Sequence, residues 1–481
     1  MARFPNPVRL IVLYIGLGLA RVDLVDDVRA ERTTDLAWPR IVTWLARMSK
    51  NAADAAMVGI GVGPAAIAGV GFAGPYWGLT FSLGAGIAAG TIALVSQSYG
   101  AGESERLGQA VRSSVLLIIA VTVPLGALYL AVPRELIGLL SSDPAAIGHG
   151  TDYLRVVAFG VPFAALNLIG SRALIGADDA WTPMVLRTGG GAANIVLNAV
   201  FIFGLGMGTT GAALATVFAN VGVTAAFAVA IFRGRLPMIG SLAIEVAAIG
   251  AYADPGTLRD VVEIGLPVVG RNTVWTAARF PMFAVLDLFG STVVAAYVIS
   301  RRVWGLMNTP GWGFGLAASS LVGQELGTGE EGAAESYGRE IVRFSTATYL
   351  VFAAIVAVLA RPIVLAFVGD PGDPSVPVAV NLVYAACLAV VGQGVNSTIA
   401  GALDASGDTR WTFYSQALGM FGGSLSLAYL GATTGLGLWG LYLSFFAETF
   451  VPAVINYYRF ATGKWKAISR EYRPEVAVKN D

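Results

Sequence analysis

Apolar segments long enough to cross a membrane recur along almost the whole chain, and this limits the possible folds most strongly. A bilayer core of about 30 Å needs about 20 apolar residues in helical form. Because backbone groups in hydrocarbon must bond within their own segment, each such segment is expected to be a helix. The sequence therefore predicts an all-α integral membrane protein with about twelve transmembrane helices, at 37–60, 65–97, 109–132, 152–175, 184–204, 209–232, 258–288, 292–324, 339–360, 377–402, 412–431 and 435–459.

The composition excludes several classes of function. Only 13% of the residues are charged, whereas soluble proteins have roughly 25%. Lys+Arg and Asp+Glu both number 31, so no basic surplus points to nucleic acid. The single cysteine, Cys387, and the single histidine, His149, are too few for a disulfide framework or a typical zinc site. No Walker loop, dinucleotide fingerprint or nucleophile elbow stands out, so we expect neither an enzyme nor a cofactor.

The termini and the basic residues predict the orientation. The apolar stretch 8–20 is too short to span and is followed by charged residues, so residues 1–35 are expected to form a cytoplasmic amphipathic segment on the membrane surface. A cleaved signal peptide is the alternative, although no clean cleavage site follows. Arginine and lysine are concentrated before the first span, after the last span and in alternate loops. This bias predicts a plasma-membrane protein with both termini in the cytoplasm.

The second half of the chain repeats the first at a nearly constant offset. The segment 94–102 (LVSQSYGAG) resembles 321–329 (LVGQELGTG), and 173–179 (ALIGADD) resembles 402–408 (ALDASGD). Six spans per copy is an even number, so both copies enter the membrane in the same direction and frame a substrate path. We predict two pseudo-symmetric six-helix bundles, with the N-lobe at 36–232, a cytoplasmic linker at 233–257, the C-lobe at 258–459 and a cytoplasmic tail at 460–481.

Asp54 is the main functional candidate, because an ionisable side chain at membrane depth is costly. The fifth predicted span carries Asn194 and Asn198 one turn apart, and the sixth carries Thr216. One carboxylate among neutral oxygens suits a proton or one Na⁺. The alternatives are that Asp54 only pairs with Lys50, one helical turn earlier, and that the polar residues only join helices. We expect Lys50 instead to extend toward the cytoplasm.

The second copy lacks this polar set. The repeat places Pro281, Gly423 and Leu427 where the first copy has Asp54, Asn194 and Asn198. A coupling ion is therefore expected in the N-lobe only. The C-lobe offers Gln393, Asn396 and Arg279 as a possible substrate cleft, with packing or interfacial roles as the equal alternative.

The order and spacing of the motifs resemble the multidrug and toxic compound extrusion (MATE) family, from about Leu36 to about Arg459. The matching elements include Asp54-x-x-Met57-Val58-Gly59, the paired segments 94–102 and 321–329, and Gly407-Asp408-Thr409-Arg410. The resemblance implies two six-helix bundles around a cleft and antiport of H⁺ or Na⁺ against organic compounds.

Site residues also follow from this resemblance. In the archaeal and DinF-like branch, the N-lobe site resembles Asp54, Tyr153, Asn194, Asn198 and Thr216, although that branch often has Asp at the place of Asn198. The acidic positions of the NorM-like branch look like Trp275 and Gln393, which are neutral here.

Taken together, these features predict a cation-coupled antiporter that exports small organic, amphipathic compounds by alternating access. It is expected to act as a monomer among membrane lipids. The alternative is a flippase of the same superfamily for lipid-linked precursors. That function would need cationic residues in the cleft, and the residues to inspect are Arg271, Arg279, Arg301 and Arg302.

Overall fold

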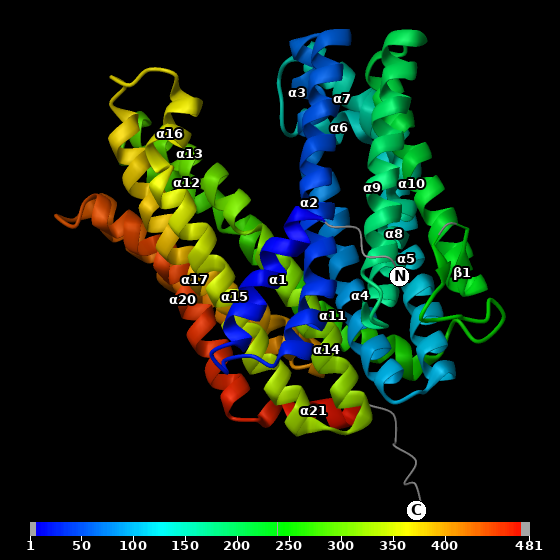
Figure 1. Ribbon diagram of the computed structural model, residues 1–481. Helices are drawn as coiled ribbons and strands as arrows, with labels where there is room; N and C mark the ends of the chain where they lie inside the picture. Colours follow the sequence, from blue (N-terminus) through cyan, green and yellow to red (C-terminus); the bar gives the residue numbers. More distant parts are fainter. Residues whose placement is uncertain (1–5, 238, 473–481) are drawn as a thin grey trace, which may run out of the picture. The chain divides into compact units, whose positions relative to one another are not determined.

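The computed structural model describes residues 6–237 and 239–472, and almost all of its elements are helices (Figure 1). The chain divides into two compact units. Unit 1 comprises residues 1–41 and 266–481, and unit 2 comprises residues 42–265. Helices α2 (Asp27–Gly61) and α11 (Pro255–Ala277) each begin in one unit and end in the other.

The remaining elements of unit 2 are α3 (Pro64–Phe72), α4 (Gly74–Gly100), α5 (Ser104–Ala131), α6 (Pro133–Gly138), α7 (Pro144–Val157), the 3₁₀ turn η1 (Ala158–Gly160), α8 (Val161–Gly176), α9 (Trp181–Asn198), the π-helix η2 (Ala199–Gly204), α10 (Gly208–Arg233), β1 (Arg235–Leu236) and β2 (Gly240–Ser241).

The remaining elements of unit 1 are α1 (Pro7–Ala20), α12 (Arg279–Asp287), α13 (Ser291–Met307), α14 (Thr309–Thr328), α15 (Glu331–Val358), α16 (Ala360–Val368), α17 (Ser375–Ser406), α18 (Thr409–Ala417), the π-helix η3 (Leu418–Leu425), α19 (Ser426–Thr433), α20 (Leu438–Ala461) and α21 (Lys464–Tyr472).

The predicted helical membrane fold is confirmed. Within the described residues, 8 helical segments are long and apolar enough to cross a membrane on their own. The other predicted spans are charged or interrupted helices: α2, α11 with α12, α13 with α14, and α18 with η3 and α19. Length and hydropathy alone therefore do not find these four spans.

The internal repeat is visible in the elements. Helices α5 and α15 both have 28 residues, and they begin at Ser104 and Glu331. Gly63 precedes α3 with φ 122°, and Gly290 precedes α13 with φ 90°. The two glycines are separated by the same offset as the starts of α5 and α15, and a backbone with such positive φ favours glycine. Each half also contains one π-helix in its fifth span: η2 lies at the end of the span, and η3 lies in the middle, before α19.

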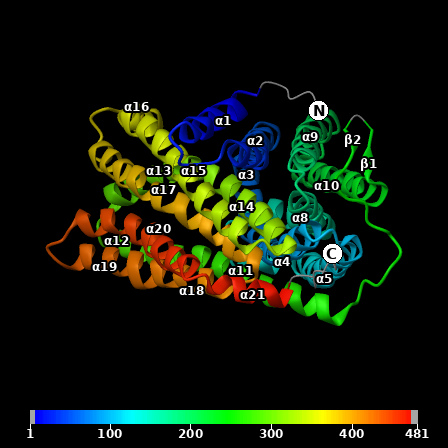
Figure 2. The same ribbon diagram turned by 60° about the horizontal axis from the view of Figure 1, so that its bottom comes forward.

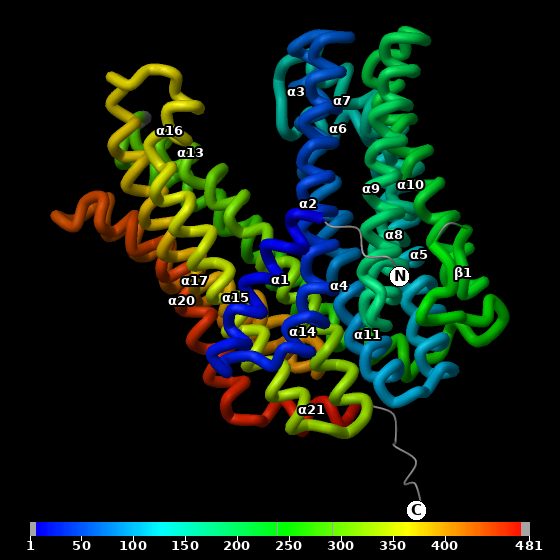
Figure 3. The backbone as a smooth tube through the Cα atoms, viewed as in Figure 1, coloured from blue at the N-terminus to red at the C-terminus, as the bar shows by residue number. Residues whose placement is uncertain are grey.

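Each unit has a central helix, which is the fourth span of its repeat. In unit 2, α8 packs against α4, α5 and α10, and in unit 1, α17 packs against α13, α14, α15 and α20 (Figures 2 and 3). Small residues allow close approach without side-chain interdigitation. A Cβ added to Gly401 of α17 would lie 2.0 Å from the carbonyl oxygen of Gly315 in α14, so these two backbones touch.

The predicted linker between the repeats folds back onto unit 2. Strands β1 and β2 pair antiparallel, with Arg235 opposite Ser241. The buried guanidinium of Arg112 in α5 then donates to the carbonyl oxygens of Ala247 (3.2 Å) and Ala251 (3.3 Å). We call residues 234–254 the strap, because they are fastened at both ends to the same unit.

The N-terminal helix α1 packs in unit 1 with Arg9, Val12 and Gly16 on its buried side. Arg9 pairs with Asp35 of α2 at 2.8 Å. A buried arginine on an otherwise apolar helix is thereby neutralised, so α1 is tied to α2 by charge as well as by apolar packing.

Candidate functional site

Four helices of unit 2 bring the predicted N-lobe site residues together. Asp54 lies on α2, Asn194 and Asn198 lie on α9, Thr216 lies on α10 and Tyr153 lies on α7. Asn194 and Asn198 are one turn apart, so both amides face the same way. Both are buried, as are Thr216 and Tyr153.

Hydrogen bonds connect these side chains in a row. The amide nitrogen of Asn198 donates to Asp54 Oδ1 at 2.6 Å and to Asn194 Oδ1 at 3.3 Å. Asn194 Nδ2 in turn donates to the hydroxyl of Thr216 at 3.3 Å. Asp54 is therefore hydrogen-bonded directly to Asn198, one of the residues predicted to surround it.

Lys50 completes the surroundings of the carboxylate. Its Nζ lies 2.5 Å from Asp54 Oδ2, and both side chains remain partly accessible. The expectation that Lys50 extends toward the cytoplasm is wrong, because its ammonium points along α2 to the acid one turn further on. Asp54 thus makes both the pair with Lys50 and the contact with Asn198, which the sequence left as alternatives. The ion pair reduces the cost of burying either charge.

The carbonyl oxygen of Asn198 is the most informative atom in the cluster. Both hydrogens of its amide nitrogen are used on Asp54 and Asn194, which fixes the side-chain orientation. Its Oδ1 is buried and has no hydrogen-bond partner among the described residues. A buried acceptor without a donor is costly, and such atoms occur at sites that take up an ion or water. This oxygen fits a small cation or a proton-bearing group.

A helical irregularity follows the site directly. The α-helical pattern of α9 ends at Asn198, and the π-helix η2 begins at Ala199. π-bulges are rare and frequently mark functional positions.

Tyr153 joins the site from α7. It interacts with Asp54, Thr216 and Trp77 and belongs to the apolar core that includes Val58, Ile202 and Ala212.

The polar row continues beyond the predicted residues. Asn220 Nδ2 donates to the carbonyl oxygen of Thr216 (2.9 Å), and Asn167 Nδ2 donates to Asn220 Oδ1 (3.1 Å). Thr224 then donates to Asn167 Oδ1 at 2.9 Å. Sequence reasoning missed Asn167, Asn220 and Thr224, although amides inside apolar spans are a recognisable signal.

The three predicted cleft residues of the C-lobe are in different surroundings. Arg279 is exposed at the start of α12, whereas Gln393 and Asn396 are buried in α17. Asn396 donates to Gln416 at 3.4 Å and accepts from Asn456 at 2.8 Å. Gln393 donates to Ser397 at 3.1 Å. These bonds favour the packing interpretation for Asn396, which the sequence left open.

Sequence reasoning also missed the acids that pair with the C-lobe arginines. Arg301 donates to both carboxylate oxygens of Glu448 in α20 at 3.0 Å. Arg271 likewise reaches Asp404 at 2.7 Å. Glu448 stands alone in an apolar span, and that signal was sufficient to single it out.

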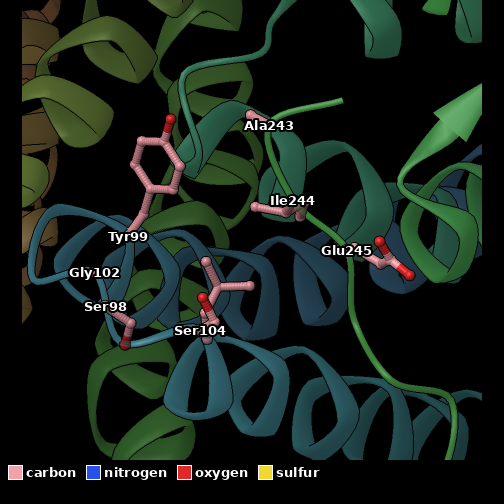
Figure 4. Close-up of a pocket in the computed structure, with 8 residues that line it drawn as sticks. Ser98, Tyr99, Gly102, Ser104, Ala243, Ile244 and Glu245 are labelled. Atoms are coloured by element: carbon pink, nitrogen blue, oxygen red, sulfur yellow. The ribbon is translucent and has the colours of Figure 1, made fainter. Parts of the chain in front are cut away.

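A small pocket lies between the strap and the junction of α4 with α5 (Figure 4). It has a volume of about 150 Å³ and is lined by Ser98, Tyr99, Gly102, Ser104, Leu107, Ala243, Ile244 and Glu245. Sites for drug-sized ligands usually occupy about 300 Å³ or more. This pocket is therefore too small to hold such a solute.

Both repeated halves match the pattern of a known protein family. The pattern of the MatE family matches residues 39–200 and 268–430. The chain belongs to the MatE family. The family pattern thus occurs twice, once in each copy of the internal repeat. Members of this family are transporters, and the chain is accordingly a multi-pass membrane transporter and not an enzyme.

Named relatives cover most of the chain. It is 27% identical over 442 residues to "Probable multidrug resistance protein NorM" of Bradyrhizobium diazoefficiens, with 89% of this chain and 92% of that protein covered. It is 28% identical over 411 residues to "Multidrug resistance protein PmpM" of Pseudomonas aeruginosa, with 83% of each covered.

Solved structures of the family have the same fold. A structure described as "Crystal structure of MATE in the bent conformation" superposes with a TM-score of 0.83 at 21% identity, covering 95% of this chain and 99% of that one. An outward-facing multidrug resistance MATE transporter gives a TM-score of 0.80 at 22% identity, covering 92% and 96%. The predicted MATE resemblance and fold are thereby confirmed.

Proposed function

We propose that this transporter is a cation-coupled antiporter that exports organic compounds, with Asp54 taking up the coupling ion, H⁺ or Na⁺. Relatives that align with most of the chain carry multidrug resistance in their names. The observation that carries the proposal is the contact of Asp54 with Asn198 and Lys50 inside a polar cluster of unit 2.

The cluster suits reversible uptake of one positive charge. A proton needs only the carboxylate of Asp54. A sodium ion needs several oxygen ligands, and the candidates are the side-chain oxygens of Asp54, Asn194, Asn198 and Thr216. Sodium would also have to displace the ammonium of Lys50, because two cations cannot share one carboxylate at low cost.

An ion can drive transport only if it binds the two states of the protein with different affinity. Neutralising Asp54 frees Lys50 and Asn198 from the carboxylate, so the packing of α2 against α9 changes its energy with ion occupancy. Binding of an organic solute from the cytoplasm would favour the opposite state and release the ion inward.

Basic residues before α2 and after α20 support cytoplasmic termini. We propose that a single chain suffices for transport and that the coupling ion is the only cofactor. Solute recognition by shape, aromatic rings and hydrogen bonds fits a chain in which Asp54, Asp404 and Glu448 already have basic partners.

The flippase alternative receives less support. It needs cationic side chains free to hold a pyrophosphate, but Arg271 is bound to Asp404 and Arg301 is bound to Glu448. Arg279 and Arg302 are exposed. The arginines that the sequence indicated for this function therefore offer little free positive charge between helices.

The test is efflux of a fluorescent organic cation from proteoliposomes, with a pH gradient and a Na⁺ gradient imposed separately. The wild-type protein should respond to one gradient and lose efflux when an ionophore collapses it. Asp54→Asn should reduce coupled efflux at least tenfold while the protein remains folded.

Asp152→Asn is the matched control, because it removes an exposed carboxylate of α7 in the same unit. Undiminished gradient-driven efflux by Asp54→Asn would remove Asp54 from the mechanism. Efflux that needs neither gradient, or transfer of lipid-linked pyrophosphates instead of the dye, would support the flippase.

A further inference from the structure

Arg172 is a buried arginine without any partner in the described part of the chain. It lies on α8, the central helix of unit 2, one turn before the end. The residue is 8% exposed. Its Nη1 is buried without a hydrogen-bond acceptor, and no ion pair or hydrogen bond joins Arg172 to any residue that the structure describes. A guanidinium has five N–H donors, and those on Nη1 have no acceptor among the described residues.

Asp179, shortly after the end of α8, does not neutralise Arg172. Asp179 caps the start of α9, where its carboxylate accepts from the backbone nitrogen of Thr182 at 2.9 Å. Burial raises the pKa of Asp179, and hydrogen bonds from Thr182 and Trp181 oppose this only in part. No arginine stabilises the charged form of this carboxylate, as would be expected for an ion pair with Arg172.

A second arginine lies nearby. Arg187, on the second turn of α9, is close enough for its positive charge to act on Arg172. Its own Nη1 is also buried without a hydrogen bond, although Arg187 has another interaction partner. Two like charges in a low-dielectric interior repel each other, so an anion beside Arg172 would lower the energy of this arrangement.

Other interior arginines have the acid partner or the carbonyl acceptors that Arg172 lacks among the described residues. Arg271, Arg301 and Arg459 each make a hydrogen-bonded ion pair with an acid at 3.0 Å or less. Arg112 reaches Glu105 at 2.7 Å and two backbone carbonyls of the strap. The chain thus supplies a counter-charge or acceptors to each of these four, and Arg172 differs from them.

We propose that Arg172, assisted by Arg187, binds an oxyanion of the phosphate class between α8 and α9. Forked guanidinium groups match the geometry of phosphate oxygens through paired hydrogen bonds. In the orientation proposed above, this end of α8 lies on the cytoplasmic side, where anionic phospholipids are concentrated. The phosphate can come from such a lipid headgroup or from a soluble phosphate.

The site differs from the cleft expected of a flippase. It lies in the N-terminal half, whereas the cationic residues expected for that function are in the C-terminal half. The site also contains one unpartnered guanidinium, whereas a flippase cleft is expected to contain several cationic side chains. The inference is independent of Asp54, because none of the hydrogen bonds of the Asp54 cluster involves Arg172.

The test uses the full-length protein, purified in a neutral detergent and depleted of lipid. Its thermal unfolding midpoint is measured with added phosphatidylglycerol, with phosphatidylcholine, with inorganic phosphate and with chloride. A ligand at ten times its dissociation constant multiplies the folding equilibrium constant by about 11, which should raise the midpoint measurably. We expect phosphatidylglycerol, phosphate or both to stabilise the wild-type protein beyond phosphatidylcholine and chloride.

Arg172→Gln should abolish this response, and Arg172→Lys should keep part of it. Arg302→Gln is the matched control, because it removes one positive charge from an exposed site on α13. Stabilisation by the lipid alone identifies a headgroup site, and stabilisation by phosphate as well identifies a soluble oxyanion. If neither stabilises the wild-type protein, or if Arg172→Gln responds equally, the proposal is wrong. If Arg172→Gln stabilises the protein with no anion added and the wild type responds to none, Arg172 is only an unpaired buried charge.

Discussion

At the scale of single residues, the surroundings of Asp54 consist of hydrogen-bond donors. Asn198 Nδ2 contacts one carboxylate oxygen at 2.6 Å, and Lys50 Nζ contacts the other at 2.5 Å. Lys50 therefore occupies a place where a free cation would bind. The methylene stem of Lys50 passes Gly191 of α9, where an added Cβ would lie 4.0 Å from it. Gly191 therefore adjoins this lysine, whereas an added Cβ at Gly190 would meet Val223.

Replacing Lys50 with methionine should create a sodium-dependent protein. Without the ammonium, Asp54 and the unsatisfied oxygen of Asn198 remain available, and repulsion of an incoming cation disappears. We expect apparent Na⁺ affinity, measured by thermal unfolding in NaCl against choline chloride, to rise at least about tenfold, or 1.4 kcal/mol. Lys50→Arg should show no such gain, and Lys50→Met with Asp54→Asn should lose it. An unchanged Na⁺ response in Lys50→Met would mean that Lys50 does not occupy the ion position.

At the scale of elements, the repeat reproduces backbone conformation more faithfully than side-chain chemistry. The turn at Gly63 and the turn at Gly290 both use positive φ, at equivalent places before α3 and α13. Yet Asp54 of α2 corresponds to Pro281 in α12. The two halves therefore share a scaffold, while the polar cluster belongs to one of them.

Two glycine substitutions should have opposite effects on stability. Neither Gly63 nor Gly71 would bring a new Cβ within 4 Å of another group. Gly63→Ala forces alanine into φ 122°, which should cost about 1 kcal/mol or more. Gly71→Ala lies within α3 and should stabilise the helix by about 0.5–1 kcal/mol. Thermal unfolding of both variants measures the difference. Equal shifts would show that backbone conformation is not what requires Gly63.

The helices, their repeat and one contact of the site could be predicted from the sequence. Helices and their repeat follow from local apolar length and from motifs at a fixed offset, so both were accessible. The contact of Asp54 with Asn198 was accessible because i to i+4 spacing placed the two amides on one face of α9. Partners such as Arg301 and Glu448 are 147 residues apart. The rotation of α13 against α20 decides their contact, and no local pattern reports that rotation.

At the scale of the whole molecule, the strap determines how the two repeats are connected. A free linker of this length would add conformational entropy that must be lost on folding. Instead, Val246 donates to the carbonyl oxygen of Ile231 (2.9 Å), and Arg112 holds residues 247 and 251. The connection is thereby shortened to the few residues that precede α11.

Arg112→Met should release the strap. The substitution removes hydrogen bonds from a charged donor, each typically about 1.5–3 kcal/mol, while keeping the length of the side chain. We expect cleavage within residues 243–251 by a nonspecific protease to become at least about tenfold faster, as measured by mass spectrometry of the fragments. Arg259→Met is the control, because Arg259 is largely exposed. Equal protection in both variants would show that Arg112 does not hold the strap.

The interior acids differ in how firmly their partners hold them. Arg301 grips both oxygens of Glu448, and Arg271 uses two nitrogens on Asp404. Lys50 makes a single contact, at the end of a flexible four-carbon stem, with one oxygen of Asp54. An arginine that makes two hydrogen bonds holds its acid in a fixed position. A lysine that makes one contact can move away, and a cation can then take its place. Asp54, beside the unsatisfied oxygen of Asn198, is therefore the acid that can exchange its partner. Asp404 and Glu448 are held in fixed positions.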